Sequence, residues 1–199
     1  MTLTDRISIL EHCNREFPKG VAVEVGVAGG HFARQILATW KNIGKLHLVD
    51  PWKHFDETQF KDGYVDGYNL DQETQEARYQ DIINYFKAFP NVNVIREEST
   101  IAAIAFPAES VHFVYIDANH CYEATKIDCH VWWRTVRTGG IMAGHDYYNS
   151  GQHFEVKKAV DEFAQSRGLT VLSTTRENSR PSAIYGESWE GPSWAIRKP

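Results

Sequence analysis

Four side chains suited to acid–base or metal chemistry follow two apolar segments that are typical of β-strands. Asp117 and His120 come after the first segment, and His145 and Asp146 come after the second. If the strands are parallel neighbours, their carboxyl ends share one edge of a sheet, and the four groups converge on a small volume. Close carboxylates repel each other unless a cation or a proton lies between them. We therefore expect a divalent metal bound by Asp117, His145 and Asp146, or a metal-free site with a histidine base.

The catalytic candidates in this cluster are His120, His145 and Asp146. Either histidine could act as the base that removes a proton from an acceptor. Each histidine taken alone could equally satisfy backbone groups at a strand end. A zinc site from the nearby cysteines is the weaker possibility, because the spacing of His120, Cys121, Cys129 and His130 matches no zinc module.

A second set of residues is typical of a nucleotide-like cofactor site. An apolar strand at 21–27 leads into a turn whose glycines allow positive φ and close backbone approach. Glu24 is a carboxylate within this strand and needs backbone amides or a ligand as its partner. Asp50 ends a second strand, 24 residues after Gly26. An acidic residue near that separation accepts hydrogen bonds from ribose hydroxyls in nucleotide-binding βαβ units.

An open α/β sheet with helices on both faces would position both sets. Five predicted parallel strands alternate with helices, at 21–27, 45–50, 91–96, 111–117 and 141–143. A helix at 122–137 precedes the fifth strand. The last two strands, at 169–174 and 193–197, are joined by a polar loop that is too short for a crossover helix, so they should form an antiparallel hairpin at the sheet edge.

Length and composition favour one domain over residues 1–199, with an N-terminal helix in 1–20 and a lid-like insertion at 51–70 that contacts the substrate. The net charge is -5 and there is no basic block, so no nucleic-acid partner is expected. Charges interrupt the apolar N-terminal pattern, which excludes a signal peptide or membrane span and favours a cytoplasmic protein. The three cysteines are an odd count and fit reduced thiols. We expect a homo-oligomer, because the N-terminal helix and the insertion are short for closing a pocket alone.

The motifs together resemble class I, Rossmann-like S-adenosylmethionine-dependent methyltransferases. Residues 116–123, IDANHCYE, and 139–147, GGIMAGHDY, look like the small bacterial branch related to macrocin-type O-methyltransferases. The resemblance implies a Rossmann-like doubly wound sheet. It also implies that the turn holds the methionine and sulfonium end of the cofactor, that Asp50 binds the ribose, and that Glu98 and Ser99 meet the adenine. The cofactor-binding set is then Glu24, Gly26, Val27, Ala28, Gly29, Gly30, Asp50, Glu98, Ser99 and Asp117. Glu98 could instead be a helix cap.

Two departures from the related metal-dependent enzymes affect the expected metal. His145 stands at the first position of an acidic pair, and Asn119 stands where an acidic residue is often found. A site with fewer carboxylates and more imidazoles could favour a transition metal over Mg²⁺, or could use a histidine base without a metal.

The expected activity is methyl transfer, of the EC 2.1.1 class, to an oxygen of a small molecule such as a sugar or secondary metabolite. A nicotinamide-dependent oxidoreductase is one alternative, but the chain lacks G-x-G-x-x-G and a Tyr-x-x-x-Lys relay. A non-catalytic binding protein on the same fold is the other.

Overall fold

The computed structural model describes residues 3–56, 58, 67–151, 153–174 and 191–199. Over these residues the chain forms one seven-stranded sheet in the order β3-β2-β1-β4-β5-β7-β6. The strands are β1 (Val21–Val25), β2 (Lys45–Asp50), β3 (Val92–Arg96), β4 (Val111–Ile116), β5 (Val136–Gly144), β6 (Leu172–Ser173) and β7 (Trp194–Arg197). The helices are α1 (Arg6–Glu16), α2 (His31–Thr39), α3 (Gln72–Phe86), α4 (Ser99–Ile104), α5 (Tyr122–Thr135) and α6 (Val156–Gln165). None of these helices is long and apolar enough to cross a membrane.

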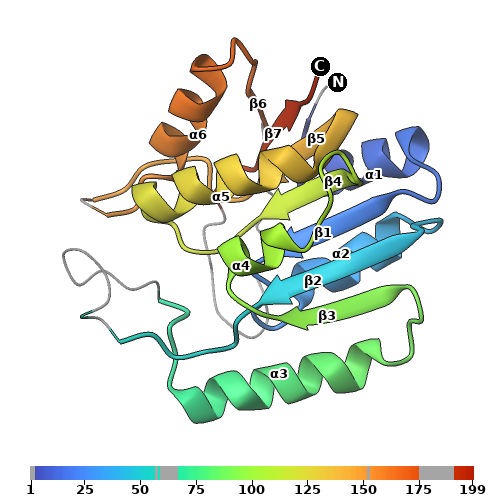
Figure 1. Cartoon of the computed structure of the whole chain (residues 1–199), viewed down its shortest axis with the longest axis vertical. Helices are drawn as coiled ribbons and strands as arrows, with labels where there is room; N and C mark the ends of the chain where they lie inside the picture. Colours follow the sequence, from blue (N-terminus) through green and yellow to red (C-terminus); the bar gives the residue numbers. More distant parts are fainter. Residues whose placement is uncertain (1–2, 57, 59–66, 152, 175–190) are drawn as a thin grey trace.

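The strand order reverses between β1 and β4, which pair in parallel in the middle of the sheet. β2 and β3 extend the parallel sheet on one side and β5 extends it on the other. β7 runs antiparallel to both β5 and β6, which confirms the predicted terminal hairpin. A reversal of this kind opens a crevice at the carboxyl ends of the central strands, where such sheets bind ligands. In Figure 1 the chain leaves β2 and β4 at the same edge of the sheet.

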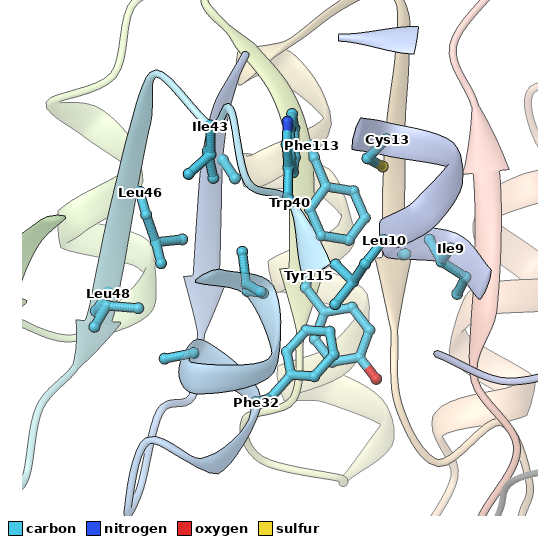
Figure 2. Close-up of a cluster of buried hydrophobic side chains, with 14 of the residues drawn as sticks. Ile9, Leu10, Cys13, Phe32, Trp40, Ile43, Leu46, Leu48, Phe113 and Tyr115 are labelled. Carbon is cyan, nitrogen blue, oxygen red and sulfur yellow. The ribbon is translucent and has the colours of Figure 1, made fainter. Parts of the chain in front are cut away.

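Helices cover both faces of the sheet, as predicted, because the central strands alternate between two cores. Leu46 and Phe113 face the first core, beneath α1, α2 and α3, which Figure 2 shows in part. Val49 and Val114 face the second core, beneath α4, α5 and α6. This alternation follows from the two-residue side-chain period of a strand. It leaves the strand ends, not the faces, available for chemistry.

Two local predictions were wrong. The predicted helix at 122–137 ends earlier, and β5 begins at Val136, which pairs with Val111. The register between β4 and β5 then shifts before Phe113, and the strand is longer than the predicted 141–143. Helix α4 was not predicted, because six residues carry too little periodicity to be recognised.

The insertion at 51–70 is described only in part, since residues 57 and 59–66 lie outside the described ranges. Its first part packs inward, with Trp52 fully buried in the first core. Asn69 pairs with the backbone of Phe55 through two hydrogen bonds of 2.8 Å. The described part therefore lies on the body of the protein and connects β2 to α3.

Candidate active site

The glycine turn lies against the end of β4. Gly26 has a φ of +87°, and a Cβ at this position would lie 1.9 Å from the carbonyl oxygen of Asp117. Gly30, with a φ of 72°, is the N-cap of α2 and supplies no side chain to cap the helix amides. Uncapped amides at a helix N-terminus favour a ligand that carries negative oxygens, such as a carboxylate. The predicted turn thus reaches both the strand-end cluster and a helix N-terminus.

The Asp50 carboxylate braces this turn. One oxygen accepts hydrogen bonds from the backbone N–H groups of Val27 and Ala28, both at 2.9 Å. The other oxygen accepts from the backbone N–H of Trp52 at 2.7 Å. The sequence predicted a ribose-binding role for Asp50, and the structure adds a backbone-holding role that spacing alone does not reveal.

Glu24 is a buried carboxylate with an unsatisfied oxygen. Its side chain is 2% exposed, and its Oε2 atom has no hydrogen-bond partner among the described residues. Burial, followed by the nearby carboxylates of Asp117 and Asp50, raises the pKa of Glu24 well above its ordinary value. The carboxylates of Asp117 and Asp50 disfavour a further anion such as pyrophosphate, and a cationic ligand would favour the ionised form of Glu24. This is the charge pattern that a sulfonium or ammonium group would complement.

The predicted adenine end is formed by β3, α4 and the segment after β2. Glu98 is the N-cap residue of α4, but its side chain makes no capping hydrogen bond and instead contacts Lys53 at 3.2 Å. A cavity of about 290 Å³ opens beside this pair. It is lined by Pro51, Lys53, Gln72, Arg96, Glu97 and Glu98.

The Ser99 side chain turns away from this cavity. Its hydroxyl donates to Asp128 at 2.5 Å and accepts from the indole N–H of Trp132 at 2.8 Å. Asp128 is buried on α5, and burial raises the pKa of its carboxyl to about 7, although the Ser99 hydrogen bond lowers it. The Ser99 hydroxyl is thus occupied by Asp128 and Trp132 in this structure. Sequence analysis missed Asp128, because helical periodicity gives no sign of a carboxylate that points inward.

The strand-end residues converge, as the topology predicted. The histidine that lies close to both carboxylates is His120, whereas His145 was the predicted metal ligand. Asp117, His120 and Asp146 each offer one ligand atom, and these atoms lie within 4.8 Å of one another. His120 Nε2 lies 3.0 Å from Asp146 Oδ2 and 3.6 Å from Asp117 Oδ1. His145 instead approaches Asp146 Oδ2 through Nδ1 at 3.2 Å and is outside this group of three.

Charges within the cluster hold Asp146 ionised. Burial alone would raise the pKa of Asp146, but the imidazoles of His120 and His145 outweigh burial and hold that pKa well below its ordinary range. Burial alone would lower the pKa of His145. The carboxylates of Asp117 and Asp146 outweigh burial and raise that pKa above its ordinary value. A buried carboxylate between two imidazoles can orient them and stabilise a proton on either ring.

An aromatic stack covers the outer side of the cluster. The His120 ring lies on Phe154 with centroids 4.6 Å apart, and Phe154 lies on Tyr148 at 4.5 Å. On another side, a Cβ at Gly191 would lie 2.6 Å from Asp146 Oδ1. Sequence analysis missed these wall residues, because nothing in their local pattern distinguishes them from ordinary loop residues.

The structure does not bring the cysteines into a metal site. Cys129 is fully buried, and burial raises the pKa of its thiol. The Cys121 sulfur accepts from the backbone N–H of Ala124 at 3.5 Å and caps α5. Among the described residues, no group capable of metal binding includes either cysteine. Cys129 instead packs in the second core.

The reversed parallel sheet, the glycine turn and the polar strand ends together define an α/β enzyme that binds a nucleotide-like cofactor. Residues 23–147 match a family described as a methyltransferase domain, and the chain belongs to this family. The match extends from β1 past Asp146, so it includes both the turn and the cluster. Family and fold together identify a class I methyltransferase, with S-adenosylmethionine as the supported methyl donor. No curated protein sequence matches the chain.

Solved structures share the fold at low sequence identity. A Clostridium thermocellum protein provisionally classed as an rRNA-methylase aligns over 100% of both chains, with 14% identity and a TM-score of 0.65. SMU.1697c of Streptococcus mutans, in complex with SAH, aligns over 100% of both chains, with 13% identity and a TM-score of 0.61. A precorrin-6y C5,15-methyltransferase of Geobacter metallireducens aligns over 97% of this chain and 86% of its own, with 13% identity and a TM-score of 0.62. At these identities the likeness shows the fold alone.

Proposed function

We propose that this protein transfers the methyl group of S-adenosylmethionine to an oxygen of a small molecule, in the manner of the macrocin-type branch. One observation carries the proposal. The cofactor turn packs directly against Asp117, since a Cβ on Gly26 would lie 1.9 Å from the Asp117 carbonyl oxygen. The methyl donor and the carboxylate–imidazole cluster would therefore be neighbours, as methyl transfer to an activated oxygen requires.

The charge of the turn favours this cofactor over a nicotinamide dinucleotide. Glu24 Oε2 is buried and has no hydrogen-bond partner in the described part of the chain, and Asp50 and Asp117 add negative charge nearby. S-adenosylmethionine would bring a sulfonium and an ammonium group to these carboxylates, whereas a dinucleotide would bring a pyrophosphate. Its own carboxylate would meet the uncapped N-terminus of α2, and its adenine would occupy the cavity beside Glu98.

His120 is the proposed base. Asp146 and Asp117 lie on either side of its Nε2, and the stack on Phe154 fixes the plane of the ring. The Nε2–H group of His120 would face the two carboxylates, and its Nδ1 would take the proton of an acceptor hydroxyl while the oxygen lone pair forms a bond to the methyl carbon. The carbon–sulfur bond breaks in the same step, and its electron pair remains on sulfur, so a neutral thioether leaves. His145 would hold Asp146 from its other side.

A divalent metal is the second candidate for activating the acceptor. Asp117, His120 and Asp146 fit such an ion, because two carboxylate oxygens and one imidazole nitrogen already lie within 4.8 Å of one another. This set replaces the sequence-predicted ligand His145 with His120. A bound ion would lower the pKa of the acceptor hydroxyl and orient it.

Calorimetric titration of cofactor-free protein with S-adenosylmethionine, with NAD as the comparison ligand, tests the cofactor. Saturable binding of S-adenosylmethionine alone supports the proposal. Methyl transfer from labelled cofactor to panels of small hydroxylated acceptors, with and without a chelator, then separates the two modes of activation. Loss of transfer on chelation, with recovery on adding a divalent ion, favours the metal. A folded, cofactor-free sample that does not bind S-adenosylmethionine would end the proposal.

A further inference from the structure

Trp52 is a buried side chain that reaches the cofactor turn and has no part in the chemistry above. It is fully buried, and its indole N–H donates to the carbonyl oxygen of Ala28 at 3.0 Å. Its backbone N–H donates to Asp50, the same carboxylate that accepts from the Val27 and Ala28 amides. Trp52 and Asp50 thus hold the turn from its carbonyl side and its amide side.

The two residues joined by this hydrogen bond both have a left-handed backbone. Ala28 has a φ of 46° and Trp52 a φ of 40°, although neither is glycine. The left-handed region is unfavourable for residues with a Cβ, and such conformations persist only where the surroundings determine them strongly. Here the determining groups are the Asp50 carboxylate and the Trp52 indole. Without them, the backbone around Ala28 would relax toward other conformations.

Trp52 is itself fixed from the opposite side. Its carbonyl oxygen accepts from Arg96 at 3.1 Å and from Gln72 at 3.3 Å. Its ring packs against Tyr79 of α3, with centroids 5.2 Å apart. Trp52 therefore connects the packing of α3 and β3 to the turn that Asp50 holds from its amide side.

We propose that Trp52 is a positioning residue for the methyl donor, acting through the Ala28 carbonyl. By holding the turn in its strained conformation, it would keep the uncapped α2 amides and the Glu24 carboxylate in place for the cofactor before it binds. Preorganisation of this kind increases affinity because less ordering is left to the binding step. The inference rests on the proposed function only for the identity of the ligand.

The test removes the indole N–H and keeps the ring as far as possible. Trp52→Phe deletes the donor to Ala28. Trp40→Phe is the matched control, because Trp40 is also fully buried and its indole N–H has no hydrogen-bond partner among the described residues. Both variants lose a similar volume from the same core. Only Trp52→Phe loses a hydrogen bond to the turn. If Trp52 contributed packing alone, the two variants would show equal changes in amide exchange and in cofactor affinity.

Two readouts decide the outcome. In cofactor-free protein, we expect the amide hydrogens of Val27 and Ala28 to exchange about tenfold faster in Trp52→Phe than in Trp40→Phe, as expected for the loss of one buried hydrogen bond. In calorimetry, we expect S-adenosylmethionine to bind about tenfold more weakly to Trp52→Phe, with little change in Trp40→Phe. If Trp52→Phe does not fold, benzothienylalanine at this position keeps the bicyclic ring and replaces N–H with sulfur.

Unchanged exchange at the turn would overturn the inference whatever the affinity. Faster exchange with unchanged affinity would also overturn it, since the turn would then be loosened without consequence for the cofactor. If the wild-type protein itself does not bind S-adenosylmethionine, the proposed function fails, and the positioning of a methyl donor fails with it. The exchange measurement still reports separately whether Trp52 braces the turn, so the two failures are distinguishable.

Discussion

The two halves of the site are held in place by different means. On the cofactor side, the backbone N–H groups of the turn donate to Asp50, and one of its carbonyl groups accepts from the Trp52 indole. On the acceptor side, Asp117, His120 and Asp146 are held mainly by contacts among side chains. A backbone-held region should respond most to changes of chain geometry, and a side-chain cluster should respond most to changes of charge. The difference predicts that binding and transfer can be lost separately.

The largest expected effect is on methyl transfer in Asp146→Asn. This change removes the negative charge that faces both imidazoles while keeping the size of the side chain. We expect transfer to fall on the order of 10²–10³-fold, the usual range for loss of an acid–base partner. The affinity for S-adenosylmethionine should stay within about threefold, because the turn does not depend on this charge. Single-turnover transfer and calorimetry on the same sample test the separation; a parallel loss of binding would contradict it.

Gly26→Ala tests the opposite half through backbone geometry. A Cβ would meet the Asp117 carbonyl oxygen at 1.9 Å and would also be strained by the φ of +87°. We expect a loss of about 3 kcal/mol or more in the free energy of unfolding, and no measurable cofactor binding. Gly139→Ala is the control, since its φ is +78° but nothing lies within 4 Å of the added Cβ. A cost of about 1–2 kcal/mol in the control isolates the strain from the clash. Equal losses of stability in the two variants would show that the contact with the Asp117 carbonyl oxygen adds nothing to the backbone strain.

The same division explains how much could be predicted from the sequence. The glycines and Asp50 were located correctly because a strand followed by a glycine turn, and an acidic residue one βαβ unit later, are local patterns with fixed geometry. The convergence of Asp117, His120 and Asp146 followed from strand order alone. The fold class was predictable for the same reason, since alternating strands and helices admit few arrangements.

Contacts made by side chains across the fold could not be predicted. Which histidine lies between the two carboxylates depends on the stack of His120 on Phe154, a residue from a distant part of the chain. The role of Trp52 depends on the hydrogen bond from its indole to Ala28, which lies before β2 in the chain. The inward orientation of Ser99 depends on Asp128. Neither periodicity nor composition contains these tertiary contacts.

Glu24→Gln changes a charge beside the cofactor turn, which is the region held by backbone hydrogen bonds. We expect S-adenosylmethionine to bind about tenfold more weakly, the usual loss for one charge-assisted contact. The cofactor-free variant should be more stable than the wild type at pH 7 by about 1–3 kcal/mol, because glutamine cannot carry the charge that burial disfavours at this position. Burial raises the pKa of Glu24 above its ordinary 4.5, so the folded wild type binds more protons than the unfolded chain and loses stability as pH rises from that value.

Urea unfolding of both proteins from pH 4.5 to pH 8 measures this effect. The difference in stability should be small at the acid end and grow as the pH rises. A variant that is less stable than the wild type at pH 7 would show that the carboxylate already has a compensating partner in the free protein.

Ser99→Ala has the smallest expected effect on cofactor binding. Its hydroxyl faces Asp128 and Trp132, not the cavity beside Glu98, so its removal should cost about 1–2 kcal/mol of stability. Affinity for S-adenosylmethionine should change by less than about threefold, because the Ser99 hydroxyl is bound to Asp128 and Trp132. Thermal unfolding and calorimetry on one preparation test both. A tenfold loss of affinity with unchanged stability would mean that the hydroxyl turns toward the adenine when the cofactor binds.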